Sequence, residues 1–233
     1  MKTCAHIQTQ GAGLYQNLGI PQPTVPAPTQ PVFPILIYGG STAMGITAIQ
    51  FAKLSGAKVI TTSSPSNFDY LKSLGADHVL DYKSPTLVQD ILSLADGPIR
   101  HVFDTYPGDA STSVSAAVLS RDGDARYVSL IPGEEQKVKA LNPHVDARYI
   151  LAYSALGDHW VYEKRYYPAV PGDYEYQKTF IVLAETLYAN GIIKTPRVFL
   201  NRGGSGFEGI LLGLDESRQG RVSGGKLVYT AGE

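Results

Sequence analysis

Short apolar runs alternate with amphipathic segments through the middle of the chain. Ile35–Tyr38 and His101–Thr105 are rich in β-branched and aromatic residues, which is typical of strands buried on both faces. Ile46–Leu54 repeats apolar residues every three or four positions, the spacing of a helix with one buried face. Strands and helices in this alternation form right-handed βαβ units. We therefore predict an α/β fold, a Rossmann-type doubly wound parallel sheet with a small C-terminal appendage.

The same patterns give the expected bounds of each element. Strands are predicted at 35–38, 58–62, 78–82, 101–105, 127–131 and 148–153, and helices at 46–54, 67–74, 84–95 and 110–119. A short helix at 11–19 precedes them. Beyond them we expect a long aromatic loop at 156–176, a helix at 176–189, a strand at 197–200, a helix at 207–219 and a strand at 226–230.

Proline marks the boundary before the first strand. Prolines are dense between Pro21 and Pro34, and they remove backbone donors and favour extended chain, as in a linker. We predict three units: an N-terminal helix and Pro-rich linker at 1–33, a Rossmann nucleotide-binding core at 34–155, and an aromatic loop, helix and C-terminal strands at 156–233.

Composition narrows the class of protein. The chain has 233 residues, of which 43% are apolar, so a substantial core can form. Its net charge of −1, without a long run of one sign, predicts neither a nucleic-acid partner nor an anionic membrane. Cys4 is the only cysteine, so no disulfide can form within the chain and a reducing compartment is expected. No apolar stretch reaches the roughly 20 residues that span a bilayer. We expect a cytoplasmic protein with no membrane segment.

The segment that follows the first strand carries the clearest chemistry. In Gly40-Ser41-Thr42-Ala43-Met44-Gly45 the outer glycines have the spacing of a dinucleotide-binding turn, and Thr42 replaces the middle glycine. Turn amides and a helix N-terminus can hold a pyrophosphate. The candidate cofactor-binding residues here are Gly40, Ser41, Thr42, Ala43 and Met44. A purely structural turn is the alternative.

The end of the second strand indicates which dinucleotide is bound. An NAD site needs Asp or Glu there for the ribose hydroxyls, whereas the segment 61–67 contains only hydroxyl, proline and amide side chains. Ser63, Ser64 and Asn67 are candidate donors to a 2′-phosphate, with added charge from Lys72, so the predicted cofactor is NADPH. In the alternative interpretation Ser66 is a helix N-cap and its neighbours are ordinary loop residues.

Further candidate cofactor-binding residues lie at the ends of the following strands. Tyr82 is placed to flank the adenine, although an ordinary strand aromatic is the alternative. Asp104 and Ser129 end the fourth and fifth strands, and we expect them to face the nicotinamide-ribose half, because sheet ligands bind at the carboxyl ends of parallel strands.

Neither a metal site nor a catalytic acid is evident. The histidines are dispersed and none forms a ligand pair with Cys4, so we predict no catalytic zinc. The aromatic loop could line an apolar pocket with phenolic donors, or it could cover otherwise exposed surface. Tyr153, His159 and Tyr162 are the candidate proton donors.

Five segments together resemble the medium-chain dehydrogenase/reductase superfamily, specifically the zinc-independent trans-acting enoyl reductases of fungal polyketide pathways. They are Tyr38–Gly45, Ser64–Asp69, Leu74–Asp77, Asp81-Tyr82 and Val222–Val228. The resemblance runs from about Gly11 to Thr230, and Thr42 is usual at its position in that family. It implies NADPH as cofactor. It also implies hydride delivery to the β-carbon of an α,β-unsaturated polyketide thioester, followed by protonation at the α-carbon.

The family pattern also includes a preceding GroES-like β domain that forms one wall of the substrate cleft, and this sequence shows none. The strands at 197–200 and 226–230 return to that domain in the family. Here we expect them to be orphaned, paired with each other, or paired across a dimer.

Three functions follow from this pattern. The first is an NADPH-binding, truncated enoyl reductase-like protein of polyketide biosynthesis, which would complete its cleft as a homodimer or with a polyketide synthase partner. The second is a non-redox cyclase or isomerase, pericyclase-like, that acts on a polyketide intermediate. The third is a non-catalytic nucleotide-binding or interaction module.

Overall fold

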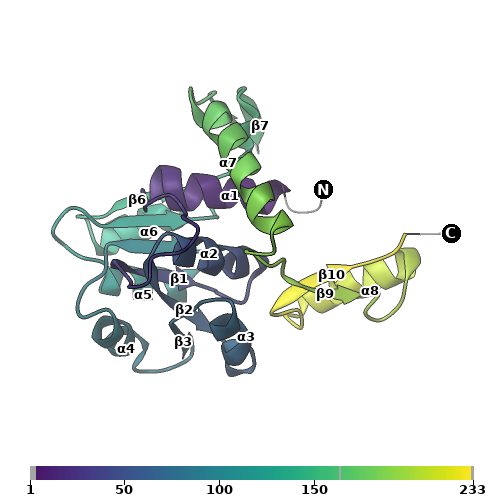
Figure 1. Cartoon of the computed structure of the whole chain (residues 1–233), viewed down its shortest axis with the longest axis horizontal. Helices are drawn as coiled ribbons and strands as arrows, with labels where there is room; N and C mark the ends of the chain where they lie inside the picture. Colours follow the sequence, from purple (N-terminus) through teal and green to yellow (C-terminus); the bar gives the residue numbers. More distant parts are fainter. Residues whose placement is uncertain (1–3, 163, 232–233) are drawn as a thin grey trace.

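A computed structural model describes residues 4–162 and 164–231, and its centre is one parallel sheet (Figure 1). The sheet has six strands in the order β3-β2-β1-β4-β5-β6, all parallel. The predicted Rossmann-type α/β fold is therefore confirmed. The strands are β1 (Phe33–Tyr38), β2 (Ala57–Ser63), β3 (His78–Asp81), β4 (His101–Asp104), β5 (Arg126–Ser129) and β6 (Asp146–Tyr149).

Alternate side chains of the central strands enter two separate cores. Ile35 and Ile37 of β1 lie in one apolar cluster, whereas Leu36 and Tyr38 lie in the other. The first cluster is closed by α1 (Cys4–Gln10), the π-helix η1 (Gly11–Asn17), α2 (Ala43–Leu54), α3 (Phe68–Ser73) and α7 (Asp173–Ala189). The second is closed by α4 (Leu87–Leu94), α5 (Asp109–Val118) and α6 (Glu134–Leu141). Burial on both faces explains why these strands read as continuous apolar runs.

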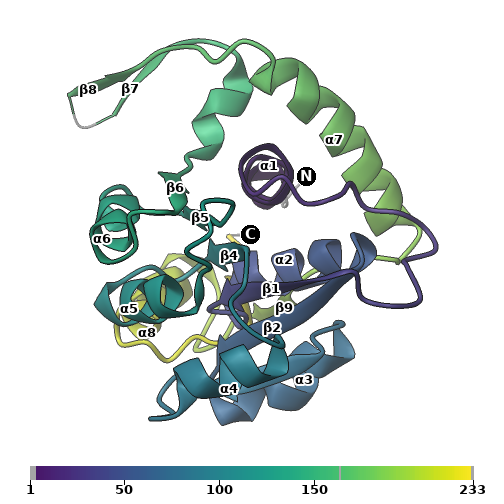
Figure 2. The same cartoon turned by 90° about the vertical axis from the view of Figure 1, so that its left-hand side faces the viewer.

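The N-terminal helix packs more deeply than its small residues suggest. A Cβ at Gly13 would lie 2.8 Å from the Phe103 ring of β4, so glycine lets η1 approach the sheet. On its other side Tyr15 packs against Phe180 of α7, with ring centroids 5.2 Å apart. Figure 2 shows α7 arching over α1. The helix begins at Cys4, earlier than the expected 11–19.

Three further details of the predicted elements are wrong. Helix α6 was missed because its sequence is polar and buries little besides Val138. The last strand of the sheet is 146–149 rather than 148–153, since this edge strand alternates polar and apolar residues and the apolar run after it turns into η3 (Ala152–Leu156). The aromatic loop contains a hairpin, β7 (Trp160–Tyr162) with β8 (Arg165–Tyr167).

Residues 197–231 form what we call the C-terminal unit. Strand β9 (Arg197–Leu200) pairs in parallel with β10 (Gly225–Val228), and α8 (Gly206–Arg218) joins them. Of the three arrangements expected for these strands, pairing with each other is the one observed. The unit projects beside the ends of the sheet strands (Figure 1). In the described ranges, no helix is long and apolar enough to cross a membrane.

Candidate cofactor site

The turn between β1 and α2 is shaped by its glycines. Gly39 has a φ of +83°, and its N–H donates to Thr62 Oγ1 over 3.0 Å. The N–H of Gly40 donates to the Thr62 carbonyl over 2.9 Å, which ties the turn to β2. A Cβ at Gly45 would collide with the Gly39 carbonyl. Glycine is therefore required at position 45 for α2 to begin directly against the turn.

Thr42 has a structural role at the position of the middle glycine. Its Oγ1 accepts from the Gly45 N–H over 2.9 Å and caps α2. The same oxygen lies 2.9 Å from Thr105 Oγ1, which donates to the Tyr38 carbonyl over 2.8 Å. The threonine thus fixes the start of α2 against the end of β4, so the helix N-terminus faces the edge where sheet ligands bind.

A polar cluster joins this turn to the end of β2. Asn67 Nδ2 donates to Ser64 Oγ over 3.2 Å and to Ser223 Oγ over 2.9 Å. Ser223 Oγ lies 3.4 Å from Ser41 Oγ, and the Gly224 N–H donates to the Ser41 carbonyl over 3.1 Å. Three distant segments of the chain therefore meet around these polar atoms.

Ser223 was missed as a site residue in the sequence. The segment 222–228 belonged to the resemblance, but no site residue was assigned in it. Only the folded chain brings it to Asn67, because 156 positions separate the two residues. Ser66 does not cap α3: a short 3-10 turn, η2 (Pro65–Asn67), comes first, and Ser64 holds its N-cap position. Ser63 is buried, and its hydroxyl donates to the Ser64 carbonyl over 3.2 Å.

Two further candidates are buried beneath the site. Asp104 is fully buried, accepts from the Tyr127 hydroxyl over 2.9 Å, and accepts from the Tyr106 N–H over 3.1 Å. Burial raises the pKa of Asp104 to about 6. Ser129 is also fully buried and donates to the Ile131 carbonyl over 2.9 Å. Both side chains are therefore buried and hydrogen-bonded within the protein at the ends of β4 and β5.

Two tyrosines are exposed at the same edge. Tyr82 follows β3 and is 44% exposed, with the Lys83 Nζ 5.6 Å from its ring centroid. Tyr106 follows β4, is mostly exposed, and would contact any Cβ placed at Gly39. Tyr106 is a second residue that the sequence interpretation overlooked.

The three candidate proton donors lie in a different region. Tyr153, His159 and Tyr162 are all exposed, in or beside the β7–β8 hairpin. Tyr153 packs against Trp160 with centroids 5.1 Å apart, and His159 Nδ1 lies 2.9 Å from an Asp158 oxygen. The hairpin and α2 lie on different sides of α1 (Figure 2), so the structure does not bring these side chains together with the glycine turn.

The described side chains do not fit a zinc site. No group of three His, Cys, Asp or Glu side chains among them could hold a metal ion. The side chains of Cys4 and His6 lie outside the described residues. The glycine turn, by contrast, fits a dinucleotide, because it offers backbone amides at a helix N-terminus and three positions, Gly39, Gly40 and Gly45, where a Cβ would collide.

Comparison with known proteins defines the class. The family model described as zinc-binding dehydrogenase matches residues 43–170, more than half of the chain. The chain therefore belongs to this family, which confirms the predicted relation to the medium-chain dehydrogenase/reductase superfamily.

The curated relatives are more specific. The chain is 43% identical over 220 residues to a dual trans-enoyl reductase/FAD-dependent monooxygenase of Aspergillus terreus, covering 92% of the chain and 30% of the relative. It is 41% identical over 225 residues to the trans-enoyl reductase ACTTS2 of Alternaria alternata, covering 96% and 62%. The chain thus spans less than two thirds of each relative's length.

Solved structures confirm the fold. The CurK enoyl reductase matches with a TM-score of 0.70 at 22% identity, covering 97% of this chain and 60% of that one. CurA of Vibrio vulnificus, solved in complex with NADPH, matches with a TM-score of 0.67 at 17% identity, covering 98% and 62%.

Proposed function

We propose that this chain forms the NADPH-binding part of an enoyl reductase of polyketide biosynthesis. The cluster of Ser64, Asn67, Ser223 and Ser41 carries the proposal, because it offers hydroxyl and amide groups beside the glycine turn. The curated relatives named trans-enoyl reductases support the reaction class.

The cluster suits a 2′-phosphate better than a free ribose. A carboxylate that accepts from ribose hydroxyls would repel a phosphate dianion, and positions 61–68 contain no Asp or Glu. Asn67 and the serine hydroxyls can each donate to phosphate oxygens in place of their present mutual bonds. Gly40, Ser41, Thr42, Ala43 and Met44 would hold the pyrophosphate at the start of α2, and Tyr82 would flank the adenine.

The reaction is the reduction of an α,β-unsaturated thioester. NADPH, when bound, supplies a hydride for the β-carbon, and the α-carbon then takes a proton. The ends of β4 and β5, at Asp104 and Ser129, would support the nicotinamide-ribose half. Among the proton-donor candidates, Tyr153 lies closest in sequence to the sheet edge, in η3 directly after β6. His159 and Tyr162 lie farther along the hairpin.

Product mass tests the reaction. The protein is incubated with a polyenoyl thioester, with and without NADPH. A gain of two mass units that requires the cofactor is the expected result. An isomeric product of unchanged mass would overturn the reductase and support the cyclase or isomerase. If neither product nor NADPH binding is found, the proposed reductase is overturned.

Partner contacts belong to the same proposal. Apolar side chains of the C-terminal unit are strongly exposed, including Phe207 at 81% and Leu211 at 66%. We propose that this surface is covered in a homodimer, or by a polyketide synthase. Light scattering should then show a dimer that Leu211→Glu dissociates, with Val161→Glu on the distant hairpin as the control. A monomer that also fails to bind a synthase would contradict the proposal.

A further inference from the structure

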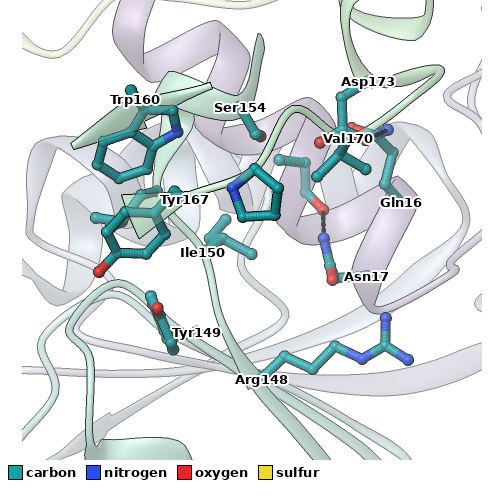
Figure 3. Close-up of a pocket in the computed structure, with 13 residues that line it drawn as sticks. Gln16, Asn17, Arg148, Tyr149, Ile150, Ser154, Trp160, Tyr167, Val170 and Asp173 are labelled. Atoms are coloured by element: carbon teal, nitrogen blue, oxygen red, sulfur yellow. Dashed lines mark hydrogen bonds between the residues drawn. The ribbon is translucent and has the colours of Figure 1, made fainter. Parts of the chain in front are cut away.

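A cavity lies away from the glycine turn. Its volume is about 460 Å³, within the range of about 300–1,000 Å³ that small-molecule sites occupy. It lies between η1, the end of β6, the β7–β8 hairpin and the start of α7, as Figure 3 shows. None of the candidate cofactor-binding residues lines it.

One wall of this cavity carries two stacked aromatic rings. The rings of Trp160 and Tyr167 are stacked, with centroids 4.0 Å apart and planes within 2° of parallel. The antiparallel register of the hairpin holds the pair, since the two residues are directly opposite each other. Leu151 also lines the cavity, and Val170 adds further aliphatic surface (Figure 3). A planar, apolar group fits such a wall better than a branched or charged one.

The opposite end of the cavity is polar. Gln16 Nε2 donates to Asp173 Oδ1 over 2.9 Å, which orients the carboxylate at the start of α7. Asn17 Nδ2 donates to the Ala12 carbonyl over 2.9 Å, so its amide oxygen is left as an acceptor. A ligand with an apolar, planar part would therefore place that part against Trp160. Any hydroxyl group of the ligand would lie near Asn17 and Asp173.

The cavity adjoins the edge of the sheet where the reaction is proposed. The lining residues Ile150 and Leu151 directly follow β6, and the Ile150 N–H donates to the Ser129 carbonyl over 3.0 Å, which places Ile150 beside the end of β5. The α1–η1 segment contacts both regions: Gln10 donates to the Met44 carbonyl at the glycine turn, and Ala12 and Gln16 line the cavity. A chain held with its thioester near β5 can thus extend into this cavity.

We propose that this cavity binds the distal, conjugated part of an unsaturated acyl chain, against the stacked rings of Trp160 and Tyr167. The acyl class of the ligand rests on the proposed function; the cavity and its stacked aromatic pair do not. The cavity selects for conjugated chains because a planar polyene stacks on an aromatic ring better than a flexible saturated chain does.

Trp160 reports directly on this binding, because it is the only tryptophan of the chain. The probe is an all-trans octatrienoyl N-acetylcysteamine thioester, whose conjugated chain accepts energy from an adjacent indole. Saturable quenching of Trp160 fluorescence is expected, and the saturated octanoyl thioester should compete about tenfold more weakly. Absence of saturable quenching, or equal competition by the saturated chain, would overturn the proposal.

Two variants with the same added ring separate pocket binding from general effects. Ser154→Phe places a phenyl group in the cavity and should weaken trienoyl binding about tenfold or more. Val161→Phe adds the ring at a strongly exposed position of the same hairpin that does not line the cavity, and should leave binding unchanged. Equal binding by the two variants would contradict the site.

Tyr167→Leu keeps the test decisive if Ser154→Phe does not fold. It removes half of the aromatic wall, so trienoyl and octanoyl thioesters should then bind alike; a retained preference would contradict the proposal. NADPH fluorescence, titrated in the same samples, separates the two proposals. Loss of trienoyl binding with intact NADPH binding overturns the cavity alone, whereas absence of NADPH binding to the unaltered protein overturns the proposed function.

Discussion

The six-stranded body, which comprises the described residues before 197, and the C-terminal unit are built in contrasting ways. Strands of the body are covered by helices on both faces, and residues such as Leu36 and Phe103 are fully buried. The C-terminal unit has two short strands and one helix, and it leaves Phe207, Leu211 and Leu200 largely exposed.

The two regions meet at the candidate cofactor site. The guanidinium of Arg197 lies 3.6 Å from the ring centroid of Tyr70, and Ser223 and Gly224 contact Asn67 and Ser41. The body therefore supplies most of the stability, whereas in the proposed function both regions would contribute to recognition of the nucleotide.

The largest effect should come from one substitution made in each region. Leu36→Ala opens a cavity in the body and should lower the free energy of unfolding by about 2–5 kcal/mol. Leu211→Ala removes the same atoms from a site on α8 that is exposed in the single chain, and should cost less than about 1 kcal/mol in dilute, monomeric protein. Urea denaturation under those conditions measures both. Comparable losses in the monomer would mean that the C-terminal unit is packed as firmly as the body.

The next effect concerns pH and the start of β4. Burial lowers the pKa of His101 to about 4. The neutral form is favoured in the folded state, so this contribution to stability is present above about pH 6.5 and is lost as the pH falls toward 4. His101→Phe should remove an acid sensitivity on the order of 2 kcal/mol in that window. Denaturation curves at pH 4 and 7 provide the measurement.

Asp104, at the other end of β4, should act with the opposite sign. Its pKa is raised by burial to about 6, so its stabilising contribution is present below about pH 4 and is lost as the pH rises through 6. Asp104→Asn should therefore be more stable relative to the unaltered protein at pH 7 than at pH 4. Glu208→Gln on the exposed face of the C-terminal unit serves as the control, and a similar pH response from it would contradict the assignment to β4.

A smaller effect is expected at the glycine turn. Thr42→Ala removes the cap of α2 and the contact with Thr105, and should lower the free energy of unfolding by about 1 kcal/mol. Thr42→Ser retains the hydroxyl and should behave almost like the unaltered protein. If serine destabilises as much as alanine, the methyl group rather than the hydrogen bonds is the important part.

The smallest change in global stability should follow Arg197→Ala. It removes the stacking of the guanidinium on Tyr70, worth about 0.5–1 kcal/mol. Unfolding of the body should be almost unaffected, while amide exchange in β10 becomes faster because the C-terminal unit is held less firmly. Arg218→Ala, at the exposed end of α8, is the matched control. Unchanged exchange in Arg197→Ala would mean that this contact does not hold the unit.

The contrast between local and distant contacts also explains which features could be predicted from the sequence. Alternation along β1 and the glycine turn are local patterns, so the fold and the position of α2 could be predicted. The contacts of Thr42 and Ser223 depend on segments far away, which no local pattern contains. Helix α6 and the hairpin were missed because the first has a polar sequence and the second has few buried residues, so neither has strong hydrophobic periodicity.

Selectivity between two dinucleotides tests the central claim most directly. NADPH and NADH are titrated against the unaltered protein, Asn67→Ala, Ser223→Ala and the control Ser205→Ala, which is an exposed serine of the same unit. The unaltered protein and the control should prefer NADPH. Asn67→Ala and Ser223→Ala should each lose about tenfold in NADPH affinity while NADH affinity stays unchanged, because a donor to the 2′-phosphate is removed. Equal affinity of the unaltered protein for both cofactors, or Ser223→Ala binding NADPH as tightly as the control, would contradict the account.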